Sequence, residues 1–242
     1  MHFSLVLESE DEGIMTKAIQ TVIERGKKKN AVAFAPDWPG LSRGASSAEG
    51  ALEKLETYAD RYRGVAALAG LSGEFPATPK FKVVEEVPGT GSTDFWAISW
   101  VPATSELGQL SKEAFERKLA ILRACWKYFD RVVARVSPEL KKGPRGGGRD
   151  RQQVVRHIFV NECQWGKLLA IDLPEDEMLT AQGRAKHRNA YVRALRAYNA
   201  AGKSARTWQL QFLLRHTAFH VMDHAWEMED KDLTNVAPTT SR

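Results

Sequence analysis

The stretch SKEAFERKLAILRACWKYFDRVVARV, residues 111–136, decides the fold of the second half of this chain. Its apolar residues recur at steps of three and four, the period of a helix that buries one face. Ser111 is a suitable N-cap, and Pro138 follows the expected end. The stretch therefore predicts one long amphipathic helix that needs partners for its apolar face, formed by Phe115, Leu119, Leu122, Trp126, Phe129 and Val133.

Three more helices are predicted after this one, within residues 149–171, 185–202 and 204–231. Connections of moderate length between four helices favour an all-α four-helix bundle over residues 105–242. The basic, glycine-rich segment KKGPRGGGRDR, residues 141–151, joins the first two helices. It could touch phosphates, but it has no interleaved aromatic residues, so we expect a solvated loop.

The first part of the chain, residues 1–104, has a different period and predicts a small α/β domain. We expect strands in HFSLVLES and NAVAFAPDWPG, a helix or strand in AIQTVIERGKKKN, and a helix in SSAEGALEKLETYADRYRGVAAL. The segment FKVVEEVPGTGSTDFWAISWVPA predicts two strands around a glycine-rich hairpin turn, because a strand-like run rather than a helix follows PGTGSTDF. The predicted fold class is therefore α+β, with this domain preceding the bundle.

Composition narrows the classes of function. The net charge of +5 over 242 residues is mildly basic, without the dense patch of a committed nucleic-acid binder. The two cysteines, Cys125 and Cys163, suit a reducing compartment and are expected to be buried thiols. Neither a signal peptide nor an apolar run long enough for a membrane span is visible, so we expect a cytoplasmic protein.

Histidine spacing marks the candidate site. Three of the six histidines, His216, His220 and His224, lie at steps of four in LRHTAFHVMDHAWEMED, residues 214–230. On a helix these side chains form one stripe, and a pair at i and i+4 can share a metal ion. A third ligand must come from another helix, and His157 lies beside the apolar stripe of VVRHIFVNE. The alternative is that each histidine is an ordinary residue of a helix interior.

The order of these segments resembles the DinB/YfiT-like superfamily of four-helix bundles. The resemblance rests on DRQQVVRHIFVNE and RHTAFHVMDHAWEMED and covers roughly residues 106–233. It implies that His157, His220 and His224 bind a divalent metal, with Zn or Ni expected, while His216 lies near the site without binding. It also implies a thiol-dependent transferase or isomerase that joins a small thiol to an electrophile. After the last ligand this chain has AWEMED, which departs from the family pattern and leaves the specific activity open.

Several side chains near these histidines have both a functional and a structural interpretation. Glu162, Asp223 and Glu227 could orient a ligand imidazole, or could simply lie on solvated helix faces. Cys163 follows His157 by six residues, so we expect it to face away from the site. Trp38, between two prolines, could be a surface anchor for a partner or for the bundle, or could pack under its own turn.

The stretch AVAFAPDWPGLSRGASSAEGALEKLETYA resembles the HicB-like antitoxin domain, in which a strand, a PDxPG turn, a short strand and a helix follow one another. This resemblance implies a protein partner for the N-terminal part, although no DNA-binding segment accompanies it.

Two functions are open for the whole chain. The first is a metal-dependent enzyme that activates a thiol or water, and the second is a non-catalytic interaction module with the bundle as scaffold. Bundles of this kind often pair, which makes a homodimer an expectation for either.

Overall fold

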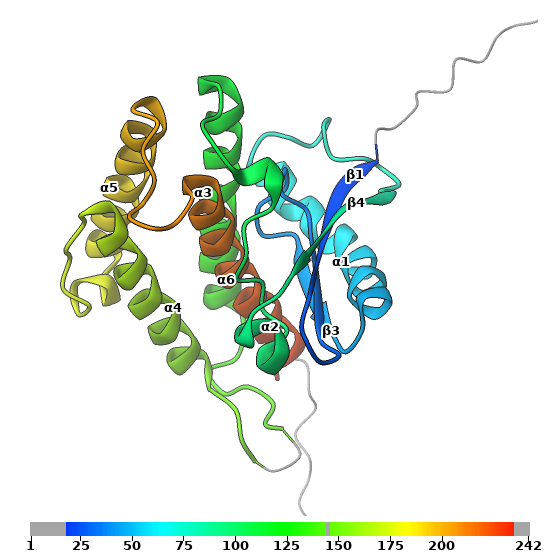
Figure 1. Ribbon diagram of the computed structural model, residues 1–242. Coiled ribbons are helices and arrows are strands. Elements are labelled where there is room, and N and C mark those ends of the chain that lie inside the picture. The colour runs from blue at the N-terminus through cyan, green and yellow to red at the C-terminus, as the bar shows by residue number, and fades with distance from the viewer. Residues whose placement is uncertain (1–17, 144–145, 235–242) are drawn as a thin grey trace, which may run out of the picture.

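The chain is an α+β protein in a computed structural model that describes residues 18–143 and 146–234 (Figure 1). A four-stranded sheet comes first and the long helices follow, as the sequence predicts. The strand predicted in HFSLVLES lies outside the described residues, as does Arg145 of the basic loop. Among the described helices, none has both the length and the apolar character that crossing a membrane requires.

The sheet has the strand order β3-β2-β1-β4. Its first three strands are antiparallel neighbours, whereas β4 pairs in parallel with β1. Parallel strands need a long connection, and here the chain passes through β2, β3 and helix α1 between β1 and β4. The segment for which helix and strand were both open is thus a strand; the bounds are β1 Ile19–Arg25, β2 Ala31–Phe34, β3 Ser42–Ala45, α1 Ala48–Leu68 and β4 Phe81–Pro88.

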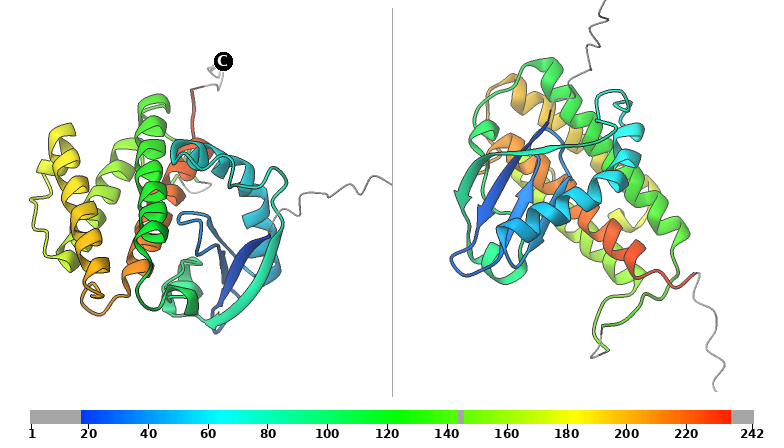
Figure 2. Two further views of the ribbon diagram at one scale, coloured as in Figure 1. Left: turned by 90° about the horizontal axis from the view of Figure 1, so that it is seen from above. Right: turned by 90° about the vertical axis from the view of Figure 1, so that its right-hand side faces the viewer.

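The two faces of the sheet are covered by different parts of the chain. Helix α1 lies along one face of the sheet (Figure 2). Ile19 and Ile23 belong to the main core, which they share with the buried residues of α1. Val22 and Phe34 belong to a smaller cluster on the opposite face, where Ala103 packs against them. Alternate residues of β1 therefore serve two cores, which explains why this strand shows no simple apolar–polar alternation.

The hairpin predicted at PGTGSTDF is wrong. Residues Gly91–Trp96 form a short helix, α2, and the described residues 97–110 that follow it contain no strand. The hydroxyl of Thr90 accepts a hydrogen bond from the Ser92 N–H, and the hydroxyl of Thr93 accepts one from the Thr90 N–H. These threonine contacts satisfy the free N–H groups of a helix start, and Ala97 ends the helix in the left-handed region with φ 51°.

Four long helices occupy the predicted places in the second half. Helix α3 matches the opening stretch closely, whereas α6 begins six residues later than predicted, after a turn in which Arg206 adopts φ 54°. The central pair, α3 and α6, packs together, and α4 and α5 lie on the side away from the sheet (Figure 1). The bounds are η1 Thr104–Glu106, α3 Lys112–Arg135, α4 Arg151–Gly166, η2 Lys167–Leu169, η3 Glu177–Leu179, α5 Ala181–Ala200 and α6 Leu210–Asp230.

The sheet and the helices share one apolar core rather than meeting across a polar seam. The turn between β2 and β3 is part of this junction. Gly40 has φ 95°, and a side chain there would approach Met222 and Cys125 closely. Trp38 is buried in T-shaped contact with Phe75, and the Arg117 guanidinium of α3 stacks on its ring, so Trp38 contacts the helical part rather than forming an exposed anchor for a partner. The turn therefore serves to seat the sheet on α3 and α6.

Candidate metal centre

Three imidazoles meet between α4 and α6. His157 on α4, together with His220 and His224 on α6, offers one ligand nitrogen each, and these atoms all lie within 4.8 Å of one another. Nε2 of His157 is 3.1 Å from Nε2 of His220. The ring centroids are 4.8 to 5.0 Å apart in all three pairs. The structure thus brings together the three histidines that the sequence singled out.

These separations suit a shared cation. Zinc bonds to imidazole nitrogen at about 2.0–2.1 Å in a tetrahedral site, which places two such nitrogens about 3.3 Å apart. The observed 3.1 Å between His157 and His220 is close to that separation. Two neutral rings can instead share one proton across this gap, but that contact leaves the third ring without a role. A third nitrogen within 4.8 Å is the feature that favours a cation.

The helices explain why these rings converge. His220 and His224 are one turn apart on α6, so both point from the same face. Apolar side chains of α4, including Val154 and Ile158, are buried in the main core and hold that helix against the bundle. His157 lies between them in sequence, and its ring is therefore directed toward α6. Trp165, about two helix turns further along α4, packs edge-on against His220 with centroids 5.0 Å apart.

Glu227 sets the orientation of His224. Its Oε2 lies 2.6 Å from Nδ1 of His224, and its Oε1 accepts a hydrogen bond from the Lys231 ammonium at 2.5 Å. These contacts lower the pKa of Glu227 to about 2, with the His224 contact the larger cause. A carboxylate at Nδ1 holds the proton there and leaves the Nε2 lone pair for a metal. Of the three predicted orienting acids, Glu227 is the one that contacts a ligand histidine.

The other two acids have different partners. Asp223 forms an ion pair with Arg43 at 2.5 Å, and the Arg43 guanidinium stacks on the ring of Trp226. Glu162 is buried and accepts hydrogen bonds from Arg188. Both acids therefore hold helices and strands together, which is the structural interpretation.

Burial favours the neutral form of two rings of the site, His157 and His220. Desolvation, with the nearby charges of Arg149 and His224, lowers the pKa of His157 to about 4. Desolvation is also the main cause that places the pKa of His220 well below its usual value. A neutral imidazole has a free lone pair, which is the form that binds a metal. Near neutral pH these two side chains are thus ready to act as ligands without first losing a proton.

His216 is outside the group of three, as expected, and is enclosed by aromatic rings. Trp100 and Trp165 lie edge-on to it, with centroids 4.5 and 5.0 Å away. Burial lowers the pKa of His216 to about 3. Because Trp165 contacts both His216 and His220, the enclosed ring supports one wall of the site.

Both cysteines are buried, and neither joins the group of ligand atoms within the described residues. Burial raises the pKa of the Cys163 thiol to about 11. A thiol in that state is a poor nucleophile near neutral pH. Cys163 therefore has no place in the chemistry of this site, as the sequence predicts.

Sequence reasoning missed a buried ionic network that ties the sheet to the site. Arg215, next to His216, donates from Nε to Glu106 at 2.7 Å and from Nη1 to Ser99 at 3.0 Å. Ser99 donates in turn to Glu24 on β1, which also accepts from the Trp100 N–H. This network fixes Trp100 against His216. The available sequence signal was an arginine, Arg215, beside His216 in a helix that faces the core. Its partners could not be identified because Glu106 and Ser99 both lie more than a hundred residues away in the sequence.

Comparisons of the chain with protein-family models, with curated proteins and with solved structures gave no match. The geometry of the site is therefore the basis for assigning a function.

Proposed function

We propose that the protein binds one divalent transition metal through His157, His220 and His224, and uses it to activate a thiol or water toward a small electrophile. One observation carries the proposal: three imidazole nitrogens from two helices lie within 4.8 Å of one another. Zn or Ni suits a ligand set of imidazoles. The resemblance to DinB/YfiT-like bundles supports the same ligand set, and it supports a thiol as the second substrate.

Three protein ligands leave an open position, which is the pattern of catalytic rather than structural zinc sites. When bound, a divalent cation lowers the pKa of a thiol or water ligand toward neutrality and so supplies a nucleophile. Glu227 keeps the proton of His224 on Nδ1, and Trp165 shields His220 from solvent on one side. The chain thus provides three imidazole ligands, a fixed orientation for the His224 ring and an aromatic wall beside His220.

Metal content of the purified protein tests the binding. We expect inductively coupled plasma mass spectrometry to find one equivalent of metal in the wild type and none in His220→Ala. His187→Ala is the matched control, because His187 is a buried histidine on α5 outside the group. Equal metal content in wild type and His220→Ala would refute the site. Turnover of a panel of small thiols with electrophiles, with and without chelator, then tests catalysis.

A second candidate function is a protein-interaction module that acts through residues 1–104. The observation that favours it is a pair of exposed aromatic rings on α2, Phe95 and Trp96, which are 68% and 70% exposed. Large apolar side chains on a surface often mark a partner site. The order β2, turn, β3, α1 agrees with the HicB-like resemblance. A defined partner that co-purifies with the wild type but not with Phe95→Ser/Trp96→Ser, while metal removal changes nothing, would favour this function.

A further inference from the structure

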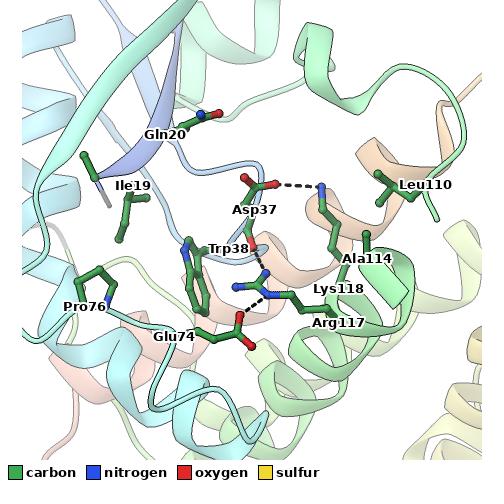
Figure 3. A pocket seen from close by; sticks show the side chains of 11 residues that line it. Ile19, Gln20, Asp37, Trp38, Glu74, Pro76, Leu110, Ala114, Arg117 and Lys118 are labelled. Atoms are coloured by element: carbon green, nitrogen blue, oxygen red, sulfur yellow. Dashed lines mark hydrogen bonds and ion pairs between the residues drawn. The ribbon is translucent and has the colours of Figure 1, made fainter. Parts of the chain in front are cut away.

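A second candidate site lies on the other side of α3, away from the three histidines. A cavity of about 380 Å³ opens between the start of β1, the turn after β2, the loop after α1 and the first turns of α3 (Figure 3). This volume is in the range of about 300–1,000 Å³ that small-molecule sites occupy. None of its lining residues belongs to the metal centre. The charged side chains in its wall are Asp37, Glu74, Arg117 and Lys118.

Lys118 is unusual among the lysines because it is buried, with 6% of its surface exposed. Its ammonium group donates to Oε1 of Gln211 at 2.9 Å, and Gln211 is itself held by a hydrogen bond to the Gly108 carbonyl. The nearest carboxylate oxygen, on Asp37, is 3.8 Å away. Burial lowers the pKa of Lys118, with the positive charges of Arg215 and Arg117 adding to the effect, while Asp37 and Glu106 oppose it.

The chemistry of such an amine is that of a nucleophile. A lysine in a desolvated pocket beside other cations has more of its neutral form at pH 7, and neutral lysine attacks carbonyl groups. Asp37 is close enough to exchange a proton with it through one water or a small movement. Figure 3 shows the Lys118 and Asp37 side chains pointing toward each other across the pocket.

Arg117 supplies a second recognition element. Its Nε donates to Glu74 at 2.7 Å and its Nη1 to the Asp37 carbonyl at 2.8 Å, while the guanidinium stacks on Trp38 at 4.3 Å. These contacts hold the group in place. Within the described residues Nη2 makes no hydrogen bond, so it can donate to a ligand carboxylate.

We propose that this pocket captures small 2-oxo acids by forming an imine on Lys118. The Lys118 nitrogen, in its neutral form, attacks the carbonyl carbon, a C–N bond forms, and the carbonyl electrons pass to oxygen. The nitrogen then loses one proton and the oxygen takes one up, which gives the neutral carbinolamine. The carbinolamine then loses its hydroxyl as water while nitrogen gives up a proton, and the C=N bond forms. Asp37 accepts the proton from nitrogen and returns it to the leaving hydroxyl. Arg117 binds the carboxylate of the ligand.

Reductive trapping tests the proposal on the whole protein. The protein is incubated with glyoxylate and cyanoborohydride at pH 7 with chelator present, and peptide mapping follows modification at each lysine. Lys127 is the internal reference, because it is exposed on the same helix and does not line the pocket. We expect Lys118 to be modified at least about tenfold faster than Lys127, and Asp37→Asn to reduce the Lys118 rate by about tenfold or more.

Acetaldehyde, which lacks a carboxylate, serves as the second probe. We expect it to modify Lys118 several-fold more slowly than glyoxylate does, and we expect Arg117→Met to remove this difference. A Lys118 rate no greater than that of Lys127 would overturn the imine site. A fast Lys118 reaction with equal rates for both probes would overturn the assignment to 2-oxo acids. Circular dichroism of each variant checks that the fold is intact.

Discussion

Nδ1 of His224 and Oε2 of Glu227 lie 2.6 Å apart on successive turns of α6. This contact determines which nitrogen of His224 faces the other two rings. Glu227 also accepts from Lys231, so its carboxylate has fixed partners on both oxygens. The orientation of the His224 ring therefore depends on a residue outside the group of three histidines.

Glu227→Gln is expected to weaken metal affinity by about 10- to 100-fold, because the amide no longer holds the proton on Nδ1 as firmly. Competition with a chromogenic chelator measures the change. Asp223→Asn is the control, because Asp223 pairs with Arg43 and does not contact the histidines. An affinity unchanged in Glu227→Gln, or lowered equally in both variants, would contradict this role.

Acid should destabilise the metal-free protein through its buried histidines. The folded His216 ring stays neutral down to a pKa of about 3, against 6.5 in the unfolded chain. Between these values the unfolded state binds the extra proton, so the free energy of unfolding falls as pH falls, by up to about 1.4 kcal/mol per pH unit. Urea titrations with chelator between pH 7 and 4 measure this slope. His216→Phe should show a shallower slope, and an identical one would refute the assignment.

The buried pair Arg215–Glu106 should matter far more for stability than its exposed counterpart. Glu106 and Arg215 side chains are 0% and 2% exposed. Glu106→Gln leaves a buried guanidinium without its charge partner, so we expect a loss of about 3–5 kcal/mol in the free energy of unfolding. Glu86→Gln removes the exposed partner of Arg25 and should cost no more than about 1 kcal/mol. Similar losses in both variants would contradict the burial argument.

Gly183 in the first turn of α5 is expected to be intolerant of a side chain. A Cβ there would lie 1.9 Å from the Glu177 carbonyl oxygen, so Gly183→Ala forces α5 and η3 apart. We expect a loss of about 1–3 kcal/mol, despite the better helix propensity of alanine. Gly73→Ala, where no atom lies within 4 Å, is the matched control and should change stability by less than about 0.5 kcal/mol. Thermal unfolding of both variants provides the comparison.

Periodicity and local spacing predicted much of this molecule. The apolar steps of residues 111–136 indicated α3 nearly to the residue, because a long amphipathic helix repeats its signal many times. The i, i+4 spacing indicated His220 and His224, and the apolar neighbours of His157 indicated that this third histidine faces them. Helix α2 was missed because six residues give no periodic signal, and the Thr90 and Thr93 hydroxyls decide its start.

Features built from distant residues could not be predicted in this way. Lys118 reads as one of several polar residues on α3, and only the packing of the turn at Asp37 and of α6 at Gln211 encloses its amine. Glu24 resembles an ordinary polar residue of a half-buried strand, yet its partners come from residues 93–101. Buried polar groups depend on tertiary contacts, which a single sequence does not display.

The spacing of 63 residues between His157 and His220 has a further consequence. A cation bound by both histidines would cross-link the two ends of that stretch of chain, which contains all of α5. Closing so long a loop costs an unfolded chain conformational entropy. Metal binding and the docking of α4 onto α6 would therefore be thermodynamically linked. Stripping the ion would then loosen the outer helices first and leave the sheet and α3 in place.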